Sequence, residues 1–88
     1  MSDVPDAETI VAAMRALLDA RDAGRTVCPS EVARRLAGGN DGDWRALMPA
    51  VRRVAAERAR AGELVVTQRG RAVDALRARG PIRIGYAD

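Results

Sequence analysis

The sequence contains no histidine, no lysine and no phenylalanine, and it has a single cysteine, Cys28. Without histidine there is no imidazole to activate a serine or cysteine nucleophile and no imidazole metal ligand. Without lysine, Schiff-base chemistry and the P-loop Gly-Lys-Ser/Thr motif are excluded as well. One cysteine can form neither an intrachain disulfide nor a four-ligand zinc site. We therefore expect a protein that is not an enzyme and that binds no metal or other cofactor.

Long apolar runs are missing too, since the longest unbroken one covers only residues 10–14. A membrane-spanning helix needs about 20 apolar residues, and the acidic residues 1–6 lack the apolar centre of a signal peptide. We expect a cytoplasmic protein without membrane contact. The 88 residues predict a single domain over 1–88, with residues 1–5 and 86–88 frayed. Because 18 residues are alanine, the core is thin, and a homodimer is a reasonable way to bury more surface.

Glycine separates three segments that have helical periodicity. The first predicted helix begins near Asp6 and ends at Gly24, and its apolar residues recur three and four positions apart. A short extended step at residues 26–27 precedes the second helix. Pro29 occupies the first position of that helix, where its missing N–H costs nothing, and the helix ends at residue 36 or 37, just before Gly38.

The third predicted helix is long. Residues 38–43 are rich in Gly, Asn and Asp, which predicts a loop, and Asp43 at its end is a good N-cap. Pro49 interrupts the helical pattern because proline removes a backbone hydrogen bond. Either one kinked helix runs to Ala61, or residues 44–48 form a separate turn and the main helix starts at Pro49. We favour the single kinked helix.

Beyond Gly62 the pattern changes to that of an extended chain. Residues 63–67 are rich in β-branched side chains and residues 81–84 alternate apolar with polar, which predicts two strands of one hairpin. The basic segment between them, residues 68–80, is called the wing below, and in it Asp74 is expected to cap one helical turn. The element order predicts a mainly α, α+β fold: a winged helix-turn-helix with three helices and a small two- to three-stranded β-ribbon.

Four stretches carry a resemblance to a known family: residues 26–33, 44–52, 66–70 and 79–83. Together they resemble a bacterial domain-of-unknown-function family of small winged-helix proteins, over roughly residues 10–84. The resemblance implies a winged-helix fold. Because that family has no assigned activity, it implies no functional residue, and function has to be argued from the surface.

Charge is distributed unevenly along the chain, whose net charge is +3. Residues 1–24 carry a net charge of −3 and residues 25–43 are neutral, whereas residues 44–61 carry +4 and residues 62–88 carry +2. The positive field therefore lies on the third predicted helix and the ribbon. A winged helix that binds nucleic acid carries its charge on these two elements.

Arginines on these two elements are the candidate contacts to double-stranded DNA. On an ideal helix those of the third helix point away from the apolar stripe and can reach phosphate or guanine edges. In the wing, two arginines flank Gly70 and can straddle a phosphate or enter a minor groove. The predicted nucleic-acid-binding residues are Arg45, Arg52, Arg53, Arg69 and Arg71.

A second hypothesis is a protein–protein interaction module that makes no contact with nucleic acid. In this interpretation the alanine-rich first helix or the edge of the ribbon docks a partner protein, and the arginines serve solubility. The long loop favours it, because Asp41 and Asp43 bring negative charge to the start of the third helix. The remaining ribbon arginines can extend the basic patch or pair with Asp74. The two hypotheses differ in whether the folded surface has a contiguous positive face or arginines paired with acidic residues.

Three further features have simple structural interpretations. Trp44 is expected to anchor the core, as large aromatic side chains usually do. Cys28 stands at a helix start without a neighbouring base, so we expect a small half-buried residue rather than a redox-sensing thiol. Residues 40–43 superficially suggest a calcium loop, but the downstream bidentate glutamate is missing, and a loop followed by a helix cap explains them better.

Overall fold

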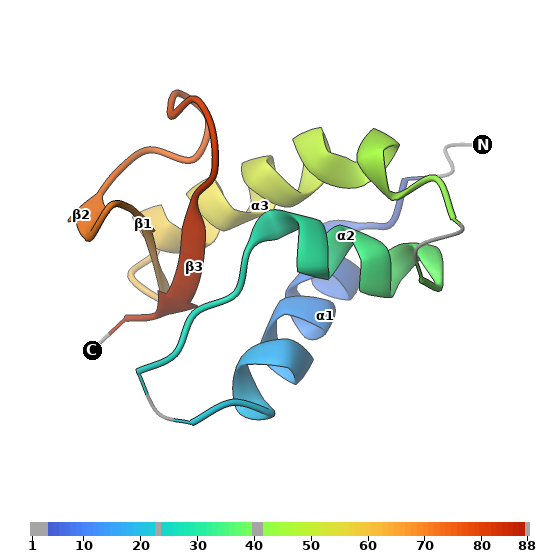
Figure 1. Ribbon diagram of the computed structural model, residues 1–88, viewed down its shortest axis with the longest axis horizontal. Helices are drawn as coiled ribbons and strands as arrows, with labels where there is room; N and C mark the ends of the chain where they lie inside the picture. Colours follow the sequence, from blue (N-terminus) through green and yellow to red (C-terminus); the bar gives the residue numbers. More distant parts are fainter. Residues whose placement is uncertain (1–3, 23, 40–41, 88) are drawn as a thin grey trace.

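In the part of the chain that the structure describes, the fold consists of three α-helices, one 3₁₀ turn and three short strands. A computed structural model describes residues 4–22, 24–39 and 42–87. The elements are α1 (Ala7–Asp19), α2 (Pro29–Ala37), the 3₁₀ turn η1 (Trp44–Leu47), α3 (Met48–Arg60), β1 (Leu64–Gln68), β2 (Arg71–Ala72) and β3 (Arg83–Tyr86). The helices pack together on one side of the molecule, and the strands with the wing occupy the other (Figure 1). The predicted small α+β class is confirmed.

The sheet is antiparallel with the strand order β2-β1-β3, so β1 is the central strand. β1 pairs with β3 along its length, from Leu64 opposite Tyr86 onward, and with β2 only at its end. Val27, between α1 and α2, extends the other edge of β3: it exchanges two backbone hydrogen bonds with Ile84, of 2.8 and 2.7 Å. The predicted pairing of two ribbon strands is thus confirmed, and β2 is an additional strand within the wing. This topology is consistent with a winged-helix arrangement.

Helix starts follow local chemistry. The Asp6 carboxylate accepts a hydrogen bond of 2.9 Å from the backbone N–H of Thr9 and so caps α1. Hydrogen bonds from the side chain and the backbone of Thr9 lower the pKa of Asp6 below its ordinary value. Pro29 lies in the first turn of α2, as predicted. Gly38 ends α2 with a φ of 83°, which lets the N–H groups of residues 38 and 39 bond back to the last turn.

The predicted end of the first helix was wrong. α1 ends at Asp19, five residues before Gly24. Arg21 supplies the reason, because its guanidinium donates to the Leu17 carbonyl at 3.3 Å and forms a 3.0 Å ion pair with Glu31 of α2. The side chain thereby satisfies a carbonyl at the helix end and turns the chain toward α2. Hydrophobic periodicity within the first helix cannot reveal an ion-pair partner ten residues further along the chain.

The preferred description of the third helix was also wrong, and the alternative holds. Residues 44–47 form the separate turn η1, and α3 begins at Met48 with Pro49 in its first turn, where no N–H is needed. Asp43 precedes η1 but its side chain makes no capping hydrogen bond. In the preceding loop, residues 40–41 lie outside the described residues. Gly42 approaches α2 so closely that an added Cβ would lie 2.9 Å from the Cβ of Ala37 and against its carbonyl.

The core lies between the three helices and the inner face of the sheet. No polar or charged residue is buried in the described part of the chain. The largest fully buried side chains are Ile10, Met14, Val27, Val32, Val51, Val66, Ile82 and Ile84. Within the same residues, no helix has both the length and the apolar character needed to cross a bilayer.

The C-terminal end is attached to the body of the protein, although we expected residues 86–88 to fray. Tyr86 pairs within the sheet, and its hydroxyl donates a 2.7 Å hydrogen bond to the carboxylate of Asp19 at the end of α1. The N–H of Ala87 bonds to the Glu63 carbonyl at 3.2 Å. Residues 1–3 and 88, which were also expected to fray, lie outside the described residues.

The hydrogen bond to Asp19 makes Tyr86 a probe of this attachment. Donation to an anionic acceptor raises the pKa of Tyr86 above its ordinary value of 10.0, because the phenolate cannot make the bond. The stabilisation is present below pH 10 and is lost as the pH rises through the raised pKa. Since Tyr86 is the only tyrosine, phenolate absorbance reports its titration directly. We expect Asp19→Asn to move the midpoint down toward 10.0, and equal midpoints would contradict the bond.

Candidate nucleic-acid interface

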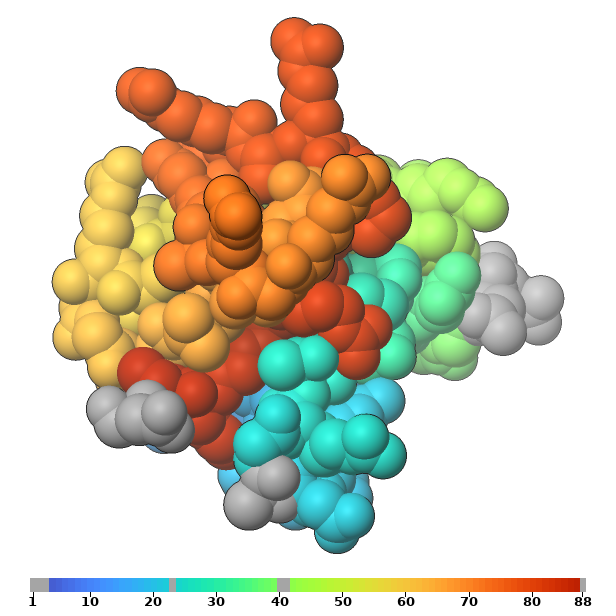
Figure 2. Space-filling view, turned by 60° about the vertical axis from the view of Figure 1, so that its left-hand side comes forward, coloured from blue at the N-terminus to red at the C-terminus, as the bar shows by residue number. Residues whose placement is uncertain are grey.

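The wing begins with a tight turn that brings two arginines to its tip. Arg69 and Gly70 have φ values of 53° and 82°, the left-handed pair typical of a type I′ hairpin turn between β1 and β2. Among the described residues, Arg69 is the one non-glycine residue with positive φ. A side chain in this region costs roughly 1 kcal/mol, so the tip holds its arginine in a strained backbone conformation. Figure 2 shows the orange wing projecting from the surface.

A second turn follows β2 and is built around Asp74. Its carboxylate accepts from the backbone N–H of Leu76 at 2.9 Å, and its carbonyl accepts from the N–H groups of Arg77 and Ala78 at 3.0 and 2.9 Å. Ala75 in this turn is buried in the core. The single helical turn capped by Asp74, expected from the sequence, is therefore confirmed, and it is anchored to the body of the protein.

Arg52 holds the wing to α3. Its Nη1 donates to the carbonyls of Ala75 and Ala78 at 3.3 and 2.8 Å, and its Nη2 donates to the carbonyl of Gly80 at 2.6 Å. These carbonyls have no strand or helix partner of their own, and the guanidinium supplies one for all three. Arg52, predicted as a DNA contact, is thus occupied within the protein and positions the wing.

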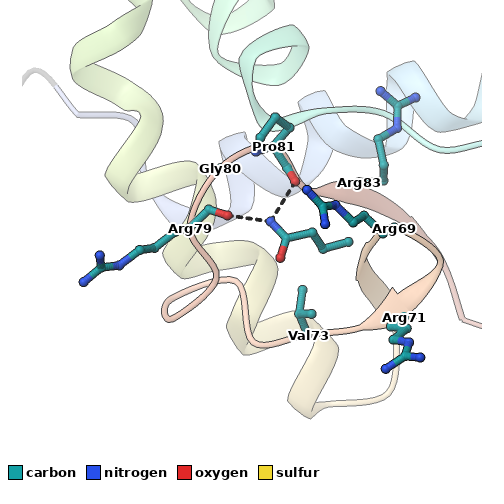
Figure 3. Close-up of a pocket in the computed structure, with 8 residues that line it drawn as sticks. Arg69, Arg71, Val73, Arg79, Gly80, Pro81 and Arg83 are labelled. Atoms are coloured by element: carbon teal, nitrogen blue, oxygen red, sulfur yellow. Dashed lines mark hydrogen bonds between the residues drawn. The ribbon is translucent and has the colours of Figure 1, made fainter.

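Gln68, which sequence reasoning did not single out, closes the wing from the other side. Its side-chain Nε2 donates to the carbonyl of Pro81 at 3.1 Å and to that of Arg79 (Figure 3). The wing has two limbs, residues 68–73 and residues 74–80, and the side chain of Gln68 joins the start of the first to the end of the second. No sequence signal could have identified this role, because the partners are backbone carbonyls 11 and 13 residues away.

A groove of about 1020 Å³ lies between the two limbs of the wing. Among the described residues its lining includes four arginines and no acidic residue, and Val73 and Pro81 add apolar surface. The full lining is Gln68, Arg69, Arg71, Val73, Arg79, Gly80, Pro81 and Arg83. In the view of Figure 3, the side chains of Arg71 and Arg79 extend to opposite sides of the groove. We call it the wing groove.

The arginines of the wing groove differ in how they are held. Arg83 donates to the hydroxyl and the carbonyl of Thr26, both at 2.8 Å, and is therefore fixed to the strand-like segment before α2. The side chains of Arg69, Arg71 and Arg79 are exposed and have no hydrogen bond or ion pair within the described residues. These three guanidinium groups are available for an external anion.

Arg45 belongs to a different cluster. The guanidinium groups of Arg34 and Arg45 lie over the ring of Trp44, at 4.3 and 4.4 Å from its centroid, as in cation–π contacts. Trp44 packs against the edge of the core and stays half-buried. Because Arg45 lies in the turn η1 and not in α3, the ideal-helix spacing that grouped it with Arg52 does not apply.

The five predicted contact residues therefore divide into two groups. Arg69 and Arg71 lie together at the wing groove, and Arg53 on α3 is exposed and has no partner within the described ranges. Arg52 is occupied by the wing carbonyls and Arg45 by the ring of Trp44. Arg79 joins the first group by position.

Two further sequence features are Cys28 and the stretch resembling a calcium loop. The Sγ atom of the half-buried Cys28 lies 2.9 Å from the hydroxyl of Ser30. Within residues 4–22, 24–39 and 42–87, no three His, Cys, Asp or Glu side chains are grouped so that they could hold a metal ion. Residues 40–41 of the calcium-like stretch lie outside these ranges.

Comparison with protein families matches residues 7–87 to a family described as a protein of unknown function, DUF3253. The chain belongs to the DUF3253 family. The match runs from the first residue of α1 to the end of the described chain and includes the wing and α3. The resemblance to a domain-of-unknown-function family is thus confirmed. No curated protein matches this DUF3253 chain, so its functional residues have to be argued from its own geometry.

The three hydrogen bonds of Arg52 predict a stability difference between two neighbouring arginines of this DUF3253 chain. Arg52→Ala leaves three carbonyls without their donor, and we expect it to lower the free energy of unfolding by about 2 kcal/mol. Arg53→Ala, the matched control that removes the same charge, should change it by less than about 0.5 kcal/mol. Urea unfolding measures both. Arg52→Lys should not restore stability, because an ammonium lacks the planar fork, and equal stabilities of the two alanine variants would contradict the clamp.

Proposed function

We propose that this protein binds double-stranded DNA, and that the wing makes the main contacts to the phosphate backbone. The observation that carries the proposal is the wing groove, which presents Arg69, Arg71 and Arg79 without internal partners among the described residues and without an acidic residue in its lining. Guanidinium groups match phosphate oxygens in charge and in their bidentate geometry. A cluster of three on a projecting hairpin fits a polyanion that runs past it.

The ion pairs of the described residues support this proposal. Glu63 pairs with Arg15 and Arg58, and Glu31 pairs with Arg21, so these acids neutralise arginines on or near the helices. The one ion pair in the described wing joins Arg77 to Asp74 at 3.9 Å. Glu31 and Glu63 are therefore engaged away from the wing groove, and none of the ion pairs of the described residues involves Arg69, Arg71 or Arg79.

The rigidity of the wing also supports the proposal. Arg52 and Gln68 hold residues 75–81 through five hydrogen bonds to their backbone carbonyls, and pairing with β1 holds β2. Because the limbs are ordered before any ligand arrives, binding does not have to supply the free energy for ordering them. Arg69 is in addition kept at the tip in a left-handed conformation that the flanking strands impose.

The helix α3 is assigned a smaller part in the contact. In a winged helix-turn-helix, which the element order supports here, the third helix enters the major groove and the wing lies over the adjacent backbone. Arg53 is exposed on α3, but Glu57 lies one turn further along the same exposed face. That carboxylate opposes a phosphate near Arg53, so we assign the main phosphate contacts to the wing and only a supporting part to α3.

The proposal is tested by fluorescence anisotropy of a mixed-sequence duplex at about 50 and 200 mM salt. Wild type should bind more weakly at the higher salt, because phosphate contacts release counterions. In Arg69→Ala/Arg71→Ala the slope of log affinity against log salt should become shallower by roughly 0.9 for each phosphate that the variant no longer engages.

A charge-matched control separates specific contacts from net charge. Arg25→Ala/Arg35→Ala removes two exposed arginines that have no partner among the described residues and do not line the wing groove, and it should keep the wild-type slope. If both double variants change the slope equally, the wing is not the contact. If wild type binds no tighter than about 10⁻⁴ M at low salt, DNA binding is excluded, and the protein–protein hypothesis takes its place.

A further inference from the structure

Leu76 is an apolar side chain held outward on the second turn of the wing. Of the large hydrophobic residues described, it is the most exposed, at 55%. In Figure 1 its turn is the orange-red loop that projects beyond the sheet, at the top of the view. Single exposed leucines are common and need no explanation by themselves. What sets this one apart is how firmly the backbone around it is held.

The backbone on both sides of Leu76 is attached to the body of the protein. Ala75 before it is 1% exposed, and Arg52 binds the carbonyls of Ala75 and of Ala78 after it. The N–H of Leu76 itself is bound by the carboxylate of Asp74. The turn therefore cannot fold the side chain inward without breaking these bonds and removing Ala75 from the core.

The charge around Leu76 indicates the class of partner. Arg77 follows directly with its side chain 90% exposed, and Arg79, also exposed, leads into the wing groove. On the other side of Leu76 lies Asp74, whose carboxylate is engaged by the N–H of Leu76 and by the 3.9 Å ion pair with Arg77. An apolar side chain followed by exposed arginines has the composition of the wedges by which proteins unstack a base step in the minor groove, where the arginines lie against phosphates and base edges. A protein partner would need an acidic rim around its apolar pocket to match the same surface.

We propose that Leu76 is such a wedge: it enters the minor groove of double-stranded DNA, separates one base step and bends the duplex. The inference rests on the proposed DNA binding and adds to it a defined contact and a deformation of the ligand. Arg52 would then act as a positioning residue, since its hydrogen bonds fix the turn from which the wedge projects.

The test is energy transfer between dyes at the two ends of a duplex of about 20 base pairs that contains several flexible TA and CA steps. Saturating wild-type protein should raise the transfer efficiency, because wedges of this kind kink DNA by about 20–90°. Leu76→Ala should bind with an unchanged salt slope but about tenfold more weakly, because less apolar surface is buried. The transfer efficiency of the duplex bound to Leu76→Ala should equal that of the free duplex. Leu76→Met, which keeps a long apolar side chain, should retain the bend.

Controls separate this inference from the proposed function. Arg69→Ala/Arg71→Ala, at saturation, should bend the duplex as wild type does, since the wedge is intact. Because Leu76 is largely exposed, unfolding curves of its variants should match wild type and show that they are folded. If wild type and Leu76→Ala bind and bend the duplex equally, or bind without bending it, the wedge is overturned while DNA binding stands. If wild type does not bind the duplex at all, both fail.

Discussion

The wing depends on one contact, in which the guanidinium of Arg52 binds three backbone carbonyls. Arg52 reaches from α3 to the turn of residues 74–80 and satisfies the carbonyls of Ala75, Ala78 and Gly80, which have no other hydrogen-bond donor among the described residues. This bond set keeps Ala75 in the core and the second limb of the wing close to the first. The shape of the wing groove and the outward direction of Leu76 both follow from it.

The chain uses arginine as its sole basic side chain, and the structure gives chemically identical residues different roles. Arg21 ends one helix and joins it to the next, Arg83 fixes a strand to its neighbouring segment, and Arg52 holds the wing. Arg69 and Arg71 have no internal partner among the described residues and line the wing groove. A surface count of positive charge would treat all of these as equal, whereas only unpaired ones can attract a phosphate at full strength.

Features that depend on near neighbours were predictable. Asp6 and Pro29 mark helix starts because a cap or a missing N–H acts within one turn, and Gly38 ends α2 because only glycine is unstrained there. The tight turn at Gly70, which places two arginines at the groove, is equally local. The end of α1 and the role of Gln68 were missed, since their partners are 10 to 13 residues away and are in part backbone atoms.

The sequence by itself determined the class of fold, the pairing of the two main ribbon strands and the basic character of the second half of the chain. Periodicity, caps and composition act over a few residues and survive without any knowledge of the fold. Only the tertiary structure decided which arginines remain free. The carbonyls that bind Arg52 are 23, 26 and 28 residues away from it. The Arg52 guanidinium is therefore occupied only because α3 and the wing pack together in the folded protein.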